Sequence, residues 1–264
     1  MTEIAVVAAK NNIARFILAI AGAAAMAWAI VAIPTFRSEN TIVDVARALM
    51  AGDAFKSENL AAIDARAETK GGSTFRSAVL GKAAVIRLRR AEDAVRAGEH
   101  QRIDQSLKSL ANIVDESLQN APSDPFLWLV RYWLDSVNNG ARPENLRFLR
   151  MSYDLGPYEG WIAVKRSRVA LTAFSALPKD LAELAISEFV GLVRWGLLSD
   201  AAEIAAGPAK SIRGTLFPRL KDLKFEQRRA FAGRIYQREL DDVLIPGINP
   251  PPVKIPMPIL PPGF

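Results

Sequence analysis

Two tryptophans 33 residues apart, each shortly after a proline, constrain the fold more than any other feature of the chain. They are Trp128 and Trp161, and the helix breaks expected at Pro143 and Pro178 show nearly the same spacing, 35 residues. A repeat of this length accommodates two helices and the turns between them. The middle of the chain is therefore predicted to be a succession of helical pairs.

Cap and turn residues indicate where these helices begin and end. Ser123 or Asp124 is expected to cap a helix with Pro125 at its first position, and Gly140 ends that helix. The next helix is expected to end at Gly156. Short turns make consecutive helices antiparallel. We therefore predict an all-α fold, a tetratricopeptide-like α-solenoid of antiparallel helical hairpins, a type of surface that binds partners and seldom carries chemistry.

An aromatic and basic surface is predicted on the same stretch. At 100° per residue, Lys165 and Arg168 fall on the helix face of Trp161. Two explanations stay open: the tryptophans pack between successive hairpins, or they stack on a sugar while neighbouring cations hold an anionic chain. The candidate partner-binding or glycan-binding residues are Trp128, Arg147, Arg150, Tyr158, Trp161, Lys165 and Arg168. Exposure of the indole rings distinguishes the two explanations.

The N-terminal part contains an uncharged apolar run, Phe16–Ile33. Its 18 residues would extend over about 27 Å as a helix, close to the thickness of a bilayer's hydrocarbon core. We therefore expect a transmembrane anchor over residues 13–34, ended by Pro34. A cleaved signal peptide is the alternative.

Flanking charges predict the orientation of this anchor. Lys10 and Arg15 precede the run, whereas Arg37 on the other side is offset by acidic neighbours. Because positive charge favours the cytoplasmic side, residues 1–12 are expected in the cytoplasm. The expected location is the bacterial inner membrane, with a single span and the remaining domain in the periplasm.

The rest of the chain shows helical periodicity up to a Pro-rich tail. Helices are expected over 75–97 and 101–119, and the tail is expected to be extended chain that either straps onto the helices or docks on a partner. The predicted division is 1–12 N-terminus, 13–34 anchor, 35–72 first hairpin and linker, 73–243 tetratricopeptide-like domain, and 244–264 tail.

Composition excludes several kinds of chemistry. The chain has no cysteine and one histidine, His100, for which a surface position is expected. It lacks metalloprotease, nucleophile-elbow, phosphate-loop and dinucleotide-binding motifs. We therefore expect a non-enzymatic protein with no cofactor and no metal. The net charge of +6 favours anionic partners only mildly, and no nucleic-acid partner is expected.

One stretch resembles a known family. The Pro-x-x-Pro-x-x-Trp entry at 122–128 and the turn Gly156-Pro157-Tyr158-Glu159-Gly160-Trp161, leading into Lys165-Arg166, are similar to VpsP-like proteins of bacterial exopolysaccharide gene clusters. These proteins have a single span and tetratricopeptide-like helices. The resemblance implies an accessory role in making or exporting a surface polysaccharide, and it supplies no catalytic residues.

Three functions remain open at the level of sequence. The leading one is a membrane-anchored periplasmic scaffold that binds other protein subunits of the polysaccharide machinery or the anionic polymer itself. An envelope or division assembly factor with no glycan role is an alternative. A glycan-acting enzyme would require two carboxylates that face one cleft.

Overall fold

The structure is a computed structural model, and its described part contains helices and no strands. It describes the backbone of residues 2–71, 77–140, 142–157, 159–238, 240 and 243–249, without the side chains of 2–17, 31–38, 66–71 and 77–78. The predicted all-α class is therefore confirmed for the part of the chain described. The chain divides into two compact units, Met1–Ala121 and Pro122–Phe264.

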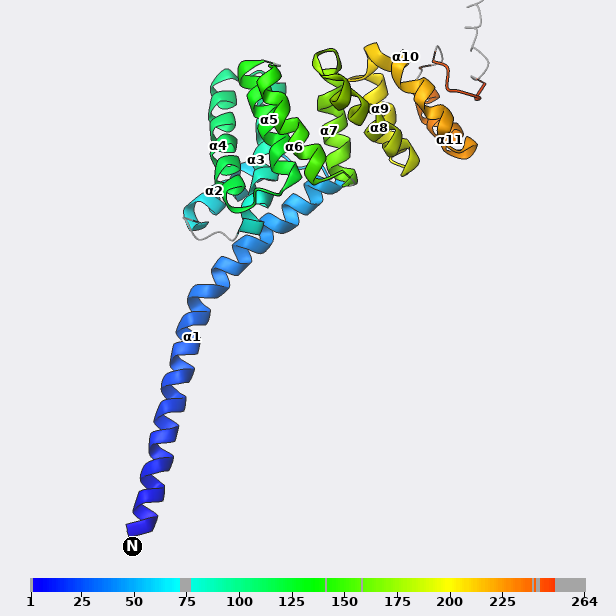
Figure 1. Cartoon of the computed structure of the whole chain (residues 1–264). Coiled ribbons are helices and arrows are strands. Elements are labelled where there is room, and N and C mark those ends of the chain that lie inside the picture. The colour runs from blue at the N-terminus through cyan, green and yellow to red at the C-terminus, as the bar shows by residue number, and fades with distance from the viewer. Residues whose placement is uncertain are drawn as a thin grey trace, which may run out of the picture. The chain divides into compact units, whose positions relative to one another are not determined.

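The described residues of the first unit form four helices (Figure 1). Glycines with positive φ end two of them, Gly52 at 96° and Gly98 at 72°, conformations that side chains rarely adopt. Helix α3 packs against both α1 and α4. The helices expected over 75–97 and 101–119 are confirmed as α3 and α4. The bounds are α1 Thr2–Ala51, α2 Ser57–Gly71, α3 Ser77–Ala97 and α4 His100–Asn120.

Helix α1 runs on past the residue at which it was predicted to stop. It is continuous from Thr2 to Ala51, so the prediction that Pro34 ends a helix is wrong. A proline inside a helix removes one backbone hydrogen bond, and a long helix tolerates that loss when the turns on both sides persist. By hydropathy, no helix among the described residues is both long and apolar enough to cross a membrane.

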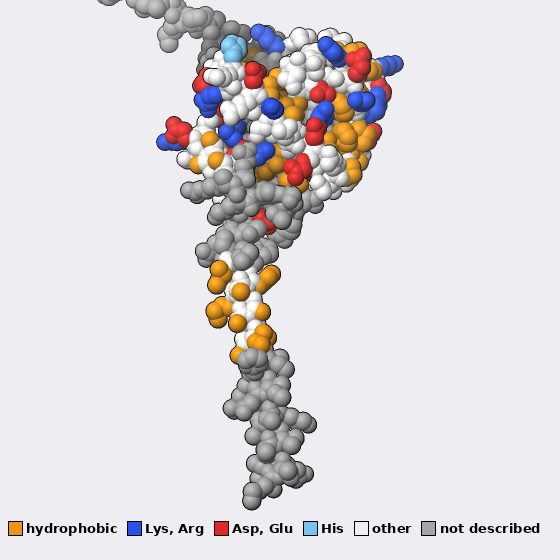
Figure 2. Space-filling model, turned by 90° about the vertical axis from the view of Figure 1, so that its left-hand side faces the viewer, with side chains coloured by type: hydrophobic (Ala, Val, Ile, Leu, Met, Phe, Trp, Pro, Cys, Tyr) orange, Lys and Arg blue, Asp and Glu red, His pale blue; other side chains and the backbone are white. Residues whose placement is uncertain are grey.

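The side chains of α1 that are described over residues 18–30 are nevertheless apolar and largely exposed. They cover residues 18–30 of the predicted anchor, and the rest of that segment lies outside the side-chain description. Hydrophobic side chains cover this part of the helix in Figure 2. The large ones, each more than half exposed, are Leu18, Ile20, Met26, Trp28 and Ile30.

The second unit consists of shorter helices joined by tight turns and 3₁₀ segments (Figure 1). Asp124 caps α5, since its Oδ1 accepts hydrogen bonds from the N–H groups of Phe126 and Leu127, and Pro125 occupies the first position as predicted. The α-helices are α5 Pro125–Asn139, α6 Leu146–Leu155, α7 Gly160–Thr172, α8 Lys179–Arg194, α9 Leu198–Ala206, α10 Arg213–Leu216 and α11 Phe225–Tyr236.

Helix α5 is covered on more than one side. It packs against α6 and also against α7, and Phe126, Leu127, Tyr132 and Leu134 are all buried. A helix between two neighbours has to be apolar on two faces, which explains its almost continuous hydrophobic sequence. Helix α7 in turn packs on α8 and α9, and α11 packs on α9 and α8.

The chain after α11 lies on that helix as far as it is described. Val243 and Ile245 are buried, and a guanidinium N–H of Arg228 donates a hydrogen bond to the carbonyl of Pro246. Residues 250–264, most of the predicted tail, lie outside the described residues.

Candidate functional site

Trp128 and Arg147 are the members of the predicted surface that share a neighbour. The Trp128 ring stacks on Phe148 of α6, with centroids 5.9 Å apart and planes 15° from parallel. The exposed Arg147 lies over the same Phe148 ring, with its Cζ 4.6 Å from the centroid, and Arg131 lies at 5.7 Å. The indole N–H of Trp128 donates to the carbonyl of Pro122 at 2.7 Å, which fixes the ring. We call Trp128, Arg131, Arg147 and Phe148 the aromatic-cation cluster.

Trp161 packs against the start of the preceding hairpin. Its ring centroid lies 4.9 Å from that of the buried Phe126 at the start of α5. Close by, a Cβ on Gly156 would lie 2.5 Å from Cγ of Pro125. The turn before Trp161 therefore fits directly onto the start of α5. Trp128 and Trp161 are both half-buried and each packs on a phenylalanine, so the packing and binding explanations both stay open.

The remaining basic candidates lie in separate ion pairs. Arg150 pairs with Asp180 at 2.5 Å, and Arg168 pairs with Glu203 at 2.7 Å. Lys165 is half-buried on α7. Tyr158 lies outside the described residues. The predicted set is thus distributed over several places, and Trp128 and Arg147 are linked through the Phe148 ring that both contact.

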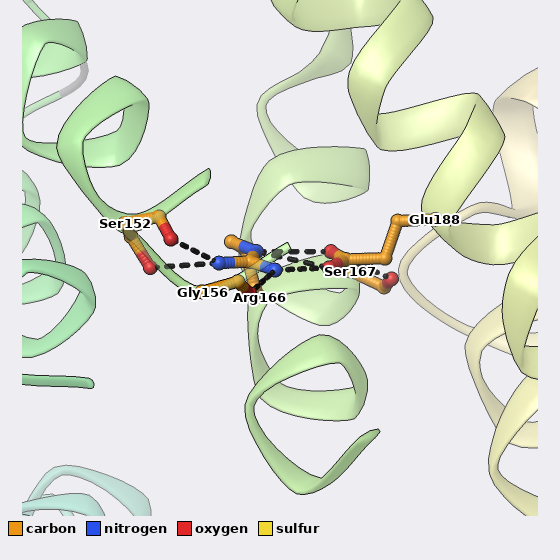
Figure 3. A network of polar contacts seen from close by, with 5 residues as sticks. All are labelled: Ser152, Gly156, Arg166, Ser167 and Glu188. Atoms are coloured by element: carbon orange, nitrogen blue, oxygen red, sulfur yellow. Dashed lines mark hydrogen bonds and ion pairs between the residues drawn. The ribbon is translucent and has the colours of Figure 1, made fainter. Parts of the chain in front are cut away.

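A buried polar network joins α6, α7 and α8 (Figure 3). Arg166 of α7 is fully buried, and its Nε lies 3.0 and 3.1 Å from the two carboxylate oxygens of Glu188 of α8. Its Nη1 donates to the carbonyl and the hydroxyl oxygen of Ser152 at 2.5 and 3.0 Å. Its Nη2 donates to the carbonyl of Gly156 at 2.9 Å and also to Glu188. The guanidinium stacks over Tyr153, 4.2 Å from the ring centroid.

Burial controls the ionisation of this network. It raises the pKa of Glu188, and the hydrogen bonds from Arg166 offset part of that shift. Burial, followed by the negative charge of Glu188, holds the pKa of Tyr153 well above its usual value. The Tyr153 hydroxyl is buried and has no hydrogen-bonding partner of suitable geometry among the described residues. Burial therefore favours the protonated phenol of Tyr153, whereas the hydrogen bonds from Arg166 favour the charged form of Glu188.

The network is built to hold helices together. A guanidinium has five N–H donors, and each one of Arg166 has an acceptor in the protein. No donor is left for a ligand, so its role is to fix three helices and the turn at Gly156. The sequence did not predict this role, because Lys165-Arg166-Ser167-Arg168 has the composition of a solvated basic cluster. The available signal was helical phase, since Arg166 shares a face with the apolar Ile162 and Ala170.

Comparisons with models of protein families, with curated proteins and with solved structures find no match to this chain. The resemblance to VpsP-like proteins therefore stays a prediction. In the part of the chain described, no three His, Asp or Glu side chains gather in a way that could hold a metal ion. His100, the first residue of α4, is exposed, as expected for a surface histidine, and is drawn in pale blue in Figure 2.

Proposed function

We propose that the chain is a non-catalytic, membrane-anchored scaffold with tetratricopeptide-like helices, accessory to the synthesis or export of a bacterial exopolysaccharide. Its anchor is the segment 13–34, its N-terminus is cytoplasmic and its helical body is periplasmic. The body binds other subunits of the polysaccharide machinery or the anionic polymer.

The observation that carries the membrane anchor in this proposal is the exposure of apolar side chains along α1. Leu18 is 72% exposed, Trp28 68% and Ile30 70%, on a stretch that has no charge. Soluble proteins seldom leave a continuous apolar surface of this kind in water. A lipid bilayer is the environment that would cover such a helix on all sides at once. Trp28 would then lie towards one interface, where indole rings are favoured.

The helical body supports a binding role. Phe126 at the start of α5 packs on Trp161 at the start of α7, so residues spaced by about one repeat form the junction between successive hairpins. Stacking of this kind creates extended surfaces for partners. The aromatic-cation cluster adds an exposed guanidinium beside a stacked indole, a combination suited to sugar rings and acidic groups.

The anchor is tested by a charge placed in the middle of the apolar run. Ala24→Arg should release the chain from membranes washed with alkaline carbonate, because an arginine at the centre of a span costs about 3 kcal/mol of insertion free energy. Asn40→Arg adds the same charge on an exposed position of the same helix beyond the run and is expected to stay bound. Equal retention of the two variants would contradict the anchor. A periplasm-selective reporter fused after Phe264 tests the orientation in the same cells.

The polysaccharide role requires a separate measurement. Deletion of the gene is expected to lower the amount of surface polysaccharide, with recovery on expression of the wild-type chain. Asn40→Arg should also restore it, whereas Ala24→Arg should not. An unchanged polysaccharide level in the deletion strain would rule out this role and favour an assembly factor without a glycan function.

A further inference from the structure

A polar cavity lies in the first unit, away from the residues considered so far. It has a volume of about 160 Å³ and is open to solvent on one side. Helices α3 and α4 supply most of its wall, and the first residue of α2 completes it. Every described residue that lines it is polar: Ser57, Arg87, Arg90, Arg102, Gln105, Ser106 and Ser109.

Two of the cavity's arginines are held in place by a buried carboxylate. Asp64 of α2 is 2% exposed and accepts a hydrogen bond from Nε of Arg87 at 2.8 Å. Arg90 donates to the second oxygen of the same carboxylate, and Nη1 of Arg87 also donates to the carbonyl of Ser109 at 3.3 Å. Arg87 and Arg90 are therefore oriented before any ligand arrives, which lowers the entropy lost on binding.

The third arginine is the most exposed of the three. Arg102 is 58% exposed on the first turn of α4, where Nη1 lies 2.9 Å from a carboxylate oxygen of Glu99. Next to it, Gln105, Ser106 and Ser109 present one amide and two hydroxyl groups along the same helix. The lining thus offers charged and neutral donors from two helices, and no carboxylate is among the described lining residues.

We infer that this cavity binds a phosphate group. Guanidinium groups match the oxygens of phosphate in geometry and charge, and hydroxyl and amide donors suit the remaining oxygens. Several donors converging from two helices suit a tetrahedral anion better than a planar carboxylate. The volume lies below the range of about 300–1,000 Å³ typical of pockets for drug-sized ligands, so the group bound is small. The site is independent of the scaffold function proposed above.

The test is titration of the full-length chain, in neutral detergent micelles, with inorganic phosphate by isothermal calorimetry. One saturable site is expected. Arg102→Gln should weaken binding about tenfold or more, because it removes a charged donor. Arg229→Gln, on an exposed position of the second unit, removes the same charge and should leave the affinity unchanged. Since Arg102 is mostly exposed, both variants are expected to melt at the wild-type temperature.

Three results would overturn the inference: no saturable binding by the wild-type chain, wild-type affinity in Arg102→Gln, or equal weakening in the two variants.

Two further experiments identify the source of the phosphate group. Binding of glycerol phosphate would support a soluble ligand. Binding only to vesicles with phosphatidic acid, and not to phosphatidylcholine vesicles, would support a lipid headgroup, provided that Arg102→Gln abolishes it. If the chain does not bind phosphate, the result expected for Ala24→Arg in the membrane-retention experiment stays the same.

Discussion

Pro125 at the start of α5 and Gly156 after the end of α6 approach each other so closely that no side chain fits at Gly156. A Cβ at this position would lie 2.5 Å from Cγ and 2.7 Å from Cβ of Pro125. The proline ring stands at the capped first position of its helix and cannot rotate away. The glycine is thus required by a close contact between the start of α5 and the end of α6, because its φ of −141° lies in a region open to other residues.

Gly156→Ala is expected to destabilise the protein. The added methyl group must displace a rigid ring, and overpacking of this kind costs about 1–3 kcal/mol of unfolding free energy. Urea denaturation provides the measurement. Gly233→Ala in α11 is the control, since no heavy atom lies within 4 Å of the added Cβ, and it should be neutral or stabilising by about 1 kcal/mol. A Gly156→Ala variant as stable as the control would show that the contact is loose.

Removal of Arg166 should be one of the most damaging single changes in the chain. Arg166→Ala leaves Glu188 buried without its partner, which costs about 3–5 kcal/mol. Arg168→Ala provides the matched control, because this arginine is partly exposed and its pair with Glu203 contributes about 1 kcal/mol or less. Urea denaturation of both variants measures the two losses of unfolding free energy. If Arg166→Ala costs no more than Arg168→Ala, the network does not hold the helices together.

The pair of Arg168 and Glu203 should be visible in the titration of the carboxylate. The hydrogen bond from Arg168 lowers the pKa of Glu203 from its ordinary 4.5. The stability that this pair contributes is present above pH 4.5 and is lost as the pH falls through the lowered pKa. In Arg168→Gln the pKa of Glu203 should return towards 4.5, as measured by NMR of its side-chain carbonyl carbon. An unchanged titration would mean that the two side chains are apart in solution.

Trp161→Ala tests whether this tryptophan packs or binds. It is half-buried against Phe126, so truncation should cost about 2 kcal/mol or more of stability, less than the 3–5 kcal/mol of a fully buried aromatic. Phe225→Ala removes an aromatic ring that is 49% exposed and should change stability by about 0.5 kcal/mol or less. Wild-type stability of Trp161→Ala combined with loss of binding to an anionic polysaccharide would favour the binding explanation.

Local signals predicted much of the second unit because they act within a few residues. The Asp124 cap, Pro125 at the first helical position and the break at Gly140 all lie where the sequence placed them. The spacing of the two tryptophans is also read directly from the sequence. In the structure, Trp161 packs on Phe126, and Gly156 lies against Pro125.

Properties that depend on distant partners were harder to predict. The burial of Arg166 was not predicted from the sequence, because its partner Glu188 lies 22 residues later on another helix. The contact of Arg87 and Arg90 with Asp64 also joins separate helices, so the polar cavity had no local signature. The helix does not end at Pro34, and the turns on both sides of this proline are helical.

The saturated guanidinium of Arg166 has a mechanical consequence. Since one side chain binds α8, the last turn of α6 and the carbonyl of Gly156 together, none of these can shift while the others stay in place. Displacing any one of these elements therefore breaks charge-assisted hydrogen bonds inside the core and leaves a buried donor or acceptor without its partner.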